Sequence, residues 1–191
     1  GIYVAIDTAT ALRKSGHPVS LIVAGDGSER IAAETYVRQN GLDFISFVGY
    51  VRGPEKHQAL ANADVYVFPS SHGEGMPLSV LEAMAAGLPV ICTRVAGLDD
   101  FFEDGRMGYS SDSASVASFV QIVTRLLRDS DELANISRYN REFAHSHFRA
   151  TVVSGRLRSI YELLTGSATR AEPSADWLQS GREMSDRRGA D

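Results

Sequence analysis

The sequence is poor in cysteine, carries little net charge and has no long apolar run. Its single cysteine, Cys92, excludes an intrachain disulfide and fits a reducing compartment. No segment approaches the roughly 18 consecutive apolar residues of a membrane-spanning helix. The formal net charge of -5 offers no basic surface for general nucleic-acid binding, so we expect no nucleic-acid partner.

What is present is the composition of a soluble globular protein. The 191 residues are 43% hydrophobic and 23% charged, which suffices for one domain with its own core. After Gly166 the apolar residues become sparse and charges of both signs mix. We therefore expect a folded domain over residues 1–166 and a disordered tail over 167–191, in which Trp177 is an unanchored aromatic residue.

Apolar runs alternate with amphipathic segments through the first two thirds of the chain. The runs predict strands at 19–25, 43–49, 64–70 and 89–95, with a short fifth at 107–112. They lack a clean polar–apolar alternation, which is typical of strands covered on both faces. Helices are expected between them, at the N-terminus and at 28–42, 54–63, 113–130, 131–148 and 149–166. This order predicts an α/β fold with a Rossmann-like parallel sheet and helices on both faces.

The first segment is already helix-like, with apolar residues at helical spacing from Ile2 to Leu12 and no cap before it. We interpret this as a cut inside a longer protein; a trimmed terminus is the alternative.

Glycine-rich segments follow several of the predicted strands. They read "GDGSER" (25–30), "GYVRGPE" (49–55), "SSHGEGMP" (70–77) and "VAGLDD" (95–100). In open parallel sheets, ligands bind beyond the carboxyl ends of the strands, in these strand-to-helix loops. The sequence therefore predicts a binding site along one edge of the sheet.

The stretch "HGEGMPLSVLEAMAAGLPV" (72–90) joins such a loop to a helix. Pro77 suits the first helical turn, Leu78, Leu81, Met84 and Ala85 form an apolar face, and Gly87 ends the helix. A helix start after a buried strand binds phosphate through free N–H groups. Glu82, inside the helix, could then accept ribose hydroxyls, while Glu74 in the loop faces a sugar. On spacing alone, a solvated Glu82 and a capping Glu74 are equally plausible.

The residues of this region resemble a known family more specifically than the spacing of Glu74 and Glu82 alone. "ADVYVFPSSHGEGMPLSVLEAMAAGLPVICT" (63–93) resembles the Glu-x7-Glu segment of retaining glycosyltransferases of the family-4 kind. "LIVAGDGSER", "ISFVGYV" and "VAGLDDFFEDGRMGY" resemble that family's neighbouring segments in the same order. The resemblance covers roughly residues 1–165.

The resemblance implies the C-terminal, donor-binding half of a GT-B fold. It implies transfer of a sugar from a nucleoside-diphosphate sugar to an acceptor hydroxyl with retention, and no cofactor or obligatory metal. An N-terminal acceptor-binding domain, with an Arg and a Lys that contact the diphosphate just upstream of Gly1, is expected as the partner of this half. The acceptor would be a glycan, a lipid or a small molecule. We expect a cytoplasmic enzyme, peripheral at most to the inner face of a membrane, and no activity from this chain alone.

The resemblance also implies roles for individual residues that match positions of the family's motifs. Glu74 matches the motif glutamate near the transfer centre, and Glu82 matches the ribose-binding glutamate. Pro77 has no N–H, so Leu78 or Ser79 must supply that phosphate contact. The remaining expected donor contacts are Gly25 and Gly27 in the first turn, Val51, Arg52 and Lys56 near the base, Gly75 and Met76 around sugar and phosphate, and Gly97, whose paired glycine is replaced by Ala96.

Other readings stay open at this point. The chain could be a non-catalytic nucleotide-sugar-binding domain, or part of a GT-B sugar phosphorylase or epimerase. His72 could bind a sugar hydroxyl or be a surface residue. Asp99 and Asp100 are interpreted as helix caps, Cys92 as a core residue, and His145 and His147 as exposed side chains without a metal partner.

Overall fold

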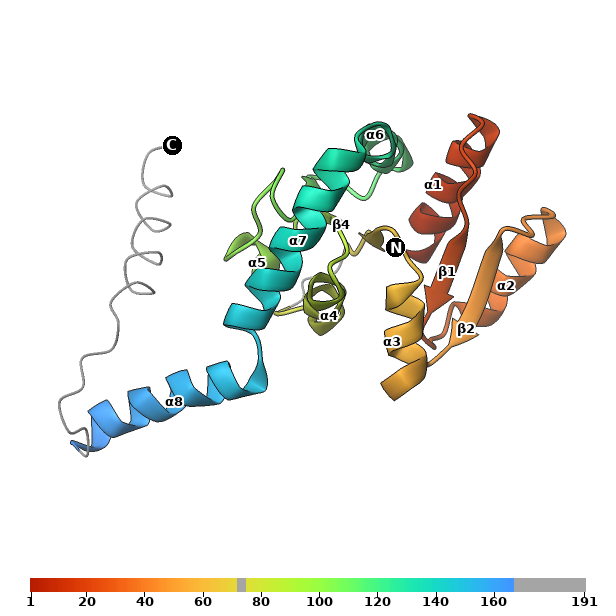
Figure 1. The fold of residues 1–191 in the computed structure, drawn as a ribbon. Helices are drawn as coiled ribbons and strands as arrows, with labels where there is room; N and C mark the ends of the chain where they lie inside the picture. Colours follow the sequence, from red (N-terminus) through yellow and green to blue (C-terminus); the bar gives the residue numbers. More distant parts are fainter. Residues whose placement is uncertain (72–74, 167–191) are drawn as a thin grey trace. The chain divides into compact units, whose positions relative to one another are not determined.

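The computed structural model describes residues 1–71 and 75–166 (Figure 1). The chain divides into two compact units, Gly1–Ala144 and His145–Asp191, and each is described by itself. The predicted tail at 167–191, with Trp177, lies outside the described residues. No helix among the described residues is long and apolar enough to cross a membrane.

The first unit alternates strands and helices as predicted. Its strands are β1 (Leu21–Ala24), β2 (Ile45–Gly49), β3 (Tyr66–Phe68), β4 (Val90–Thr93) and β5 (Gly108–Ser111). Its helices are α1 (Ile2–Lys14), α2 (Arg30–Gln39), α3 (Gly53–Ala61), α4 (Leu78–Ala86), α5 (Ala96–Asp99), α6 (Val116–Arg128) and most of α7 (Ser130–His147). The short helix α5 was not expected from the sequence.

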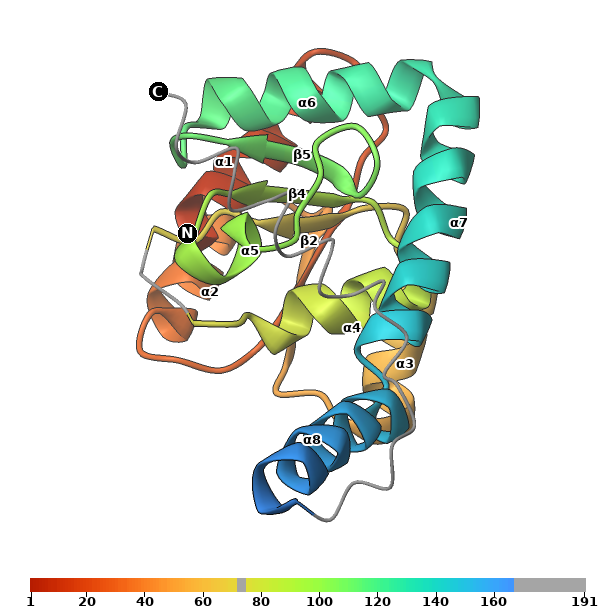
Figure 2. The same cartoon turned by 90° about the vertical axis from the view of Figure 1, so that its left-hand side faces the viewer.

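All pairings between named strands are parallel, as predicted for βαβ units. The strands fall into two sheets, one of order β1-β2 and one of order β3-β4-β5. Helices cover both faces of the second sheet, with α4 on one side of β4 and α6 on the other (Figure 2).

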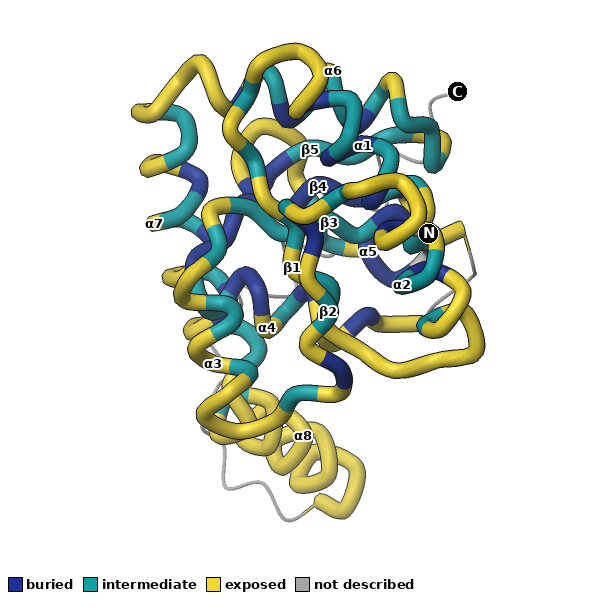
Figure 3. The backbone as a smooth tube through the Cα atoms, turned by 90° about the vertical axis from the view of Figure 1, so that its right-hand side faces the viewer, coloured by how far each residue is buried: buried dark blue, intermediate teal, exposed yellow. Residues whose placement is uncertain are grey.

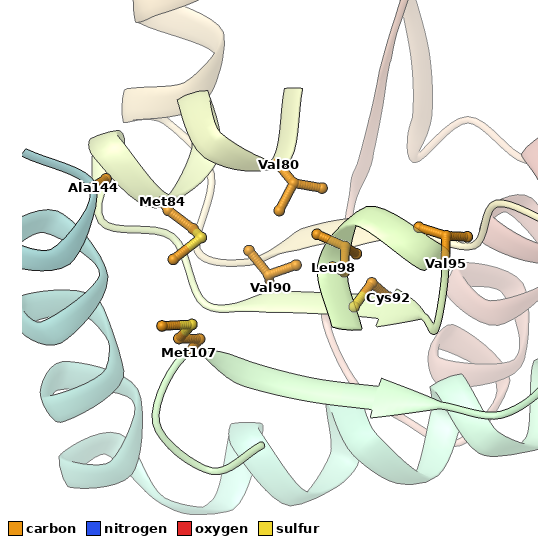
Figure 4. Close-up of a cluster of buried hydrophobic side chains, with 8 residues drawn as sticks. All are labelled: Val80, Met84, Val90, Cys92, Val95, Leu98, Met107 and Ala144. Carbon is orange, nitrogen blue, oxygen red and sulfur yellow. The ribbon is translucent and has the colours of Figure 1, made fainter. Parts of the chain in front are cut away.

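The core is centred on β4, the strand in the middle of the second sheet. Each of its four residues is buried. On one face it packs against α4, α5 and the turn before β5, where apolar side chains point toward one another (Figure 4); this cluster comprises Val80, Met84, Val90, Cys92, Val95, Leu98, Met107 and Ala144. On the other face, Ile91 packs with Phe119 and Leu126 of α6 and with Leu12 of α1.

The prediction that every strand is covered on both faces is wrong for β1 and β2. Ile45 packs with Ile6, Ala33 and Val37 of the covering helices, so only one face of this sheet lies against the core. On the other face Ile22 remains 42% exposed and Val48 45% exposed. Figure 3 shows the contrast with the buried β4. The reason is that apolar composition does not tell how many layers cover a strand.

Glycines end the helices where the sequence placed them. Gly87 follows α4 with φ 87°, and Gly41 lies just beyond α2 with φ 62°. Both values are in the left-handed region that glycine adopts without a Cβ clash.

The second unit contains α8 (Ala150–Thr165), close to the predicted 149–166. A guanidinium nitrogen of Arg149, just before this helix, lies 3.0 Å from Nδ1 of His145. Gly166 ends α8 with φ 66°.

Candidate functional site

The loops after neighbouring strands are tied to one another at the carboxyl ends of the sheets. The N–H of Gly25, after β1, donates to the carbonyl of Gly49 at the end of β2 at 2.7 Å. The Thr93 hydroxyl, at the end of β4, donates to the carbonyl of Ser70 after β3. These bonds fix the edge at which the sequence placed the site.

Gly97 lies against the loop that precedes α4. It is buried in α5, and a Cβ added there would overlap the carbonyl oxygen of Gly75 and come within 3.1 Å of Met76 Cα. Only glycine fits this approach without displacing one backbone from the other. Of the predicted site residues, the structure therefore brings Gly97, Gly75 and Met76 together.

The start of α4 differs slightly from the prediction. Pro77 is the residue before the first helical position, not a member of the first turn, and the helix begins at Leu78. The Pro77 carbonyl accepts from the N–H groups of Val80 at 3.0 Å and Leu81 at 3.4 Å. The Pro77 side chain makes no capping hydrogen bond at this end. The N–H groups of Leu78 and Ser79 have no acceptor within the helix, as helix geometry requires.

The predicted apolar face of α4 was wrong in part. Val80, Ala83 and Met84 are buried, whereas Leu78 is 68% exposed. Each residue turns an α-helix by about 100°, which places Leu78 far around the helix from Val80. Met76, in the preceding loop, is 42% exposed. Leu78 and Met76 are thus accessible at the site edge instead of contributing to the core.

Glu82 is held by a lysine from the neighbouring helix. Nζ of Lys56, in the first turn of α3, lies 2.5 Å from Oε1 of Glu82. The side chains are 32% and 44% exposed, so the pair is half-buried and accessible. The carboxylate that the sequence assigned to ribose therefore faces outward at the site edge, already oriented by a cation.

The loop after β2 presents an aromatic side chain and a cation. The Arg52 guanidinium carbon lies 5.2 Å from the centre of the Tyr50 ring, and Tyr50 is 68% exposed. Arg52 also precedes the first residue of α3, where Pro54 occupies the first turn as expected. Val51 is half-buried.

The first turn is built from exposed glycines and a charged cluster. Gly25 adopts φ 143°, a conformation that favours glycine. The carbonyl of Gly27 accepts from the N–H of Arg30 at 3.1 Å. The Arg30 side chain pairs with Glu34 at 2.8 Å and with Asp26 at 3.6 Å.

The remaining candidates differ in whether the structure describes them. Glu74, the predicted catalytic residue, and His72 lie outside the described residues. Asp99 is the last residue of α5 and Asp100 follows it, so they end a helix and do not cap its start as expected.

In residues 1–71 and 75–166, no group of three His, Cys, Asp or Glu side chains could hold a metal. Cys92 is a core residue as predicted, and burial raises the pKa of its thiol to about 12.

Sequence reasoning missed the two contacts that organise the site edge. The Lys56–Glu82 pair joins residues 26 positions apart, and the Thr93–Ser70 bond joins residues 23 apart. Lys56 was recognised only as a member of the loop near the base. No local pattern marks Thr93, because a threonine at the end of a strand is ordinary.

The comparisons with known proteins agree with this arrangement. Residues 1–143 match the family model described as glycosyl transferases group 1. The chain is 29% identical over 173 residues to a putative colanic acid biosynthesis glycosyltransferase of Escherichia coli, covering 86% of this chain and 42% of that protein. It is 27% identical over 175 residues to the phosphatidyl-myo-inositol mannosyltransferase of Mycobacterium leprae, covering 90% and 45%. The chain thus spans less than half the length of these relatives.

Solved structures share the fold. Anabaena Alr3699/HepE in complex with UDP and glucose superposes with a TM-score of 0.74 at 20% identity, covering 85% of this chain and 44% of that one. The C-terminal domain of a glycosyl transferase group 1 family protein from Francisella tularensis gives a TM-score of 0.62 at 26% identity, covering 78% and 77%.

Proposed function

The chain belongs to the glycosyl transferases group 1 family, and we propose that it is the nucleotide-sugar-binding part of a retaining glycosyltransferase. The whole protein would transfer a sugar, of the hexosyl type, from a nucleoside-diphosphate sugar to an acceptor hydroxyl. This chain alone would bind the donor without turning it over.

One observation carries the proposal: the open start of α4 lies in the same helix as the outward-facing carboxylate of Glu82. The N–H groups of Leu78 and Ser79, which have no acceptor within the helix, suit a diphosphate together with the positive end of the helix dipole. Glu82, in the next turn, suits a vicinal diol as an acceptor of hydrogen bonds. A nucleoside diphosphate carries a diphosphate next to a vicinal ribose diol, so it fits both groups of this helix.

The remaining predicted residues would contact the parts of the same ligand on either side of the diphosphate. Val51 and Arg52 would lie near the base, and Gly25 and Gly27 would let the ligand approach the backbone closely. Gly75 and Met76 would surround the sugar and the phosphate. The close approach of Gly97 to Gly75 would hold the backbone of Gly75 and Met76 in place.

The chemistry we propose is largely electrostatic. Negative charge develops on the departing diphosphate, and preorganised N–H donors at the start of α4 would stabilise it. An Arg and a Lys from the rest of the protein would add positive charge. Glu74 would orient the donor sugar. No cofactor or metal is proposed, and the acceptor, whether glycan, lipid or small molecule, would bind to the other part of the protein.

The names of similar proteins support the choice of donor. A structure that shares this fold is described as a complex with UDP and glucose, so UDP is the first nucleotide to test. GDP and ADP complete the panel because the residues do not identify the base.

A calorimetric titration of this chain with UDP, GDP and ADP tests donor binding. We expect one of the three to bind, and Glu82→Ala to weaken that binding about tenfold or more, because a hydrogen bond to a charged group is lost. Glu162→Ala, which removes the same charge from α8, is the matched control. No binding by any diphosphate at millimolar concentration would overturn the proposal.

Product analysis on the full-length protein tests the reaction. Release of nucleoside diphosphate together with a glycosylated acceptor of unchanged anomeric configuration, read by NMR, is the expected result. An epimerised donor or a sugar phosphate product would instead indicate one of the other GT-B reactions. Binding with no turnover by the full-length protein would indicate a binding domain.

A further inference from the structure

Glu82 does not stand alone at the site edge, and its partner is a residue of another helix. The contact from Lys56 runs through Oε1 of the carboxylate at 2.5 Å. This contact occupies one acceptor site of Oε1, and Oε2 and the second site of Oε1 can still accept from a ligand. A carboxylate on a flexible side chain is thereby reduced to few orientations before any ligand arrives.

The charge of Lys56 bears on the same ligand. Glu82 carries a negative charge in the helix whose start would receive a diphosphate, and like charges at short range repel. The ammonium of Lys56 offsets that charge at contact distance. Both side chains are partly withdrawn from solvent, at 32% and 44% exposure, so this compensation is only partly screened.

From this geometry we propose that Lys56 is a positioning residue for ribose recognition. It fixes the Glu82 carboxylate so that its remaining acceptor sites face the ribose diol, and it neutralises the charge that would oppose the diphosphate. Preference for a ribonucleotide over its 2′-deoxy form therefore depends on Lys56 as well as on Glu82. The inference rests on the proposed function, because it assumes that a nucleoside diphosphate binds here.

An ordinary half-exposed ion pair makes a different prediction. Such pairs contribute little to folding, and their loss changes stability slightly and ligand selectivity not at all. Selectivity for the 2′-hydroxyl is therefore the measurement that separates a positioning role from a merely structural one.

The experiment compares ribose and 2′-deoxyribose ligands on variants of the complete chain. UDP, GDP and ADP, with dUDP, dGDP and dADP, are titrated into wild type, Lys56→Met and Glu82→Ala by calorimetry. We expect wild type to favour the ribose form of its nucleotide about tenfold or more. Lys56→Met should lose most of that preference, because it weakens the ribose form more than the 2′-deoxy form; both forms carry the diphosphate and both lose the charge compensation.

Two further variants complete the design. Lys56→Met combined with Glu82→Ala should show the same ribose preference as Glu82→Ala alone, because both changes act on one contact. Lys56→Arg should retain part of the preference because it keeps the charge. Lys14→Met, at the exposed end of α1, removes the same charge away from the site and is the matched control.

The outcomes distinguish the two proposals. Lys56→Met with an unchanged ribose preference, in a protein whose melting curve is intact, overturns the positioning role. Additive losses of ribose preference in the double variant overturn it as well. If wild type binds none of the three ribonucleotides, the proposed function fails first, and the role of Lys56 falls with it.

Discussion

The backbone of Gly97 lies so close to the carbonyl of Gly75 that no Cβ fits between them. Gly97 belongs to α5, which follows β4, and Gly75 belongs to the loop that follows β3. This approach sets the distance between two loops at the site edge.

Replacing Gly97 by alanine should separate these loops. The added methyl group must displace the Gly75 carbonyl, so we expect a loss of about 1–3 kcal/mol in the free energy of unfolding. We also expect weaker binding of the diphosphate, because the start of α4 moves with the loop. Denaturant unfolding and calorimetry measure the two effects.

Gly155→Ala is the matched control for that change. Nothing lies within 4 Å of a Cβ at this position in α8, so stability should be unchanged or slightly higher. Equal behaviour of the two variants would contradict the role given to Gly97.

Val48 and Val90 offer a paired test of burial. Val48 is 45% exposed in β2, whereas Val90 in β4 is fully buried. Val90→Thr should cost about 1–3 kcal/mol of unfolding free energy, because it buries a hydroxyl among apolar groups. Val48→Thr should stay within about 0.5 kcal/mol of wild type. Similar losses at both sites would mean that the outer face of β1 and β2 is covered.

Asn140 ties α7 to the second sheet. Its buried side-chain amide donates to the carbonyls of Leu88 and Met107, each at 2.8 Å. Asn140→Ala leaves both carbonyls without this donor, and we expect a loss of about 3 kcal/mol in unfolding free energy. Asn135→Ala, on the exposed side of the same helix, should change it little. A small effect at Asn140 would show that water replaces the amide.

The single thiol reports on folding. Burial raises the pKa of Cys92 to about 12, from an ordinary value of 9.0. At pH 8 the folded chain then holds about a thousandfold less thiolate than a free cysteine, and iodoacetamide should label it only after unfolding. Mass spectrometry with and without guanidinium checks this, and rapid labelling of the folded chain would contradict the buried position.

The same shift predicts a dependence of stability on pH. Because the unfolded thiol loses its proton near pH 9 and the folded thiol near 12, the unfolded chain binds fewer protons in that window. The contribution of Cys92 to stability is therefore complete below pH 9 and declines above it. Thermal melts of wild type and Cys92→Ala should converge as the pH rises from 9 toward 12.

Much of the fold could be predicted because its signals are local. Apolar runs, helical spacing and the glycines at 41 and 87 depend on neighbouring residues, and the structure confirms the order of strands and helices. The exposed face of β1 and β2 could not be predicted in this way. Ile22 and Val48 have strand-forming side chains whatever lies above them.

The candidate site likewise has some features that local signals predict and others that they do not. The loops that gather at the sheet edge follow from parallel topology, and the sequence placed them correctly. The contacts within the site were not predictable, since Lys56 and Glu82 come from separate helices. Leu78 was assigned to the core because its apolar character was given more weight than its angle on the helix.

The backbone N–H groups at the start of α4 have a consequence for how pH affects anion binding. Pro77, the residue before this helix, contacts it through its backbone carbonyl and has no titratable side chain of its own. Amide groups do not ionise at biological pH, and the capacity of this end to receive an anion is constant. The ligand brings a pH dependence of its own, because its terminal phosphate takes up a proton near pH 6.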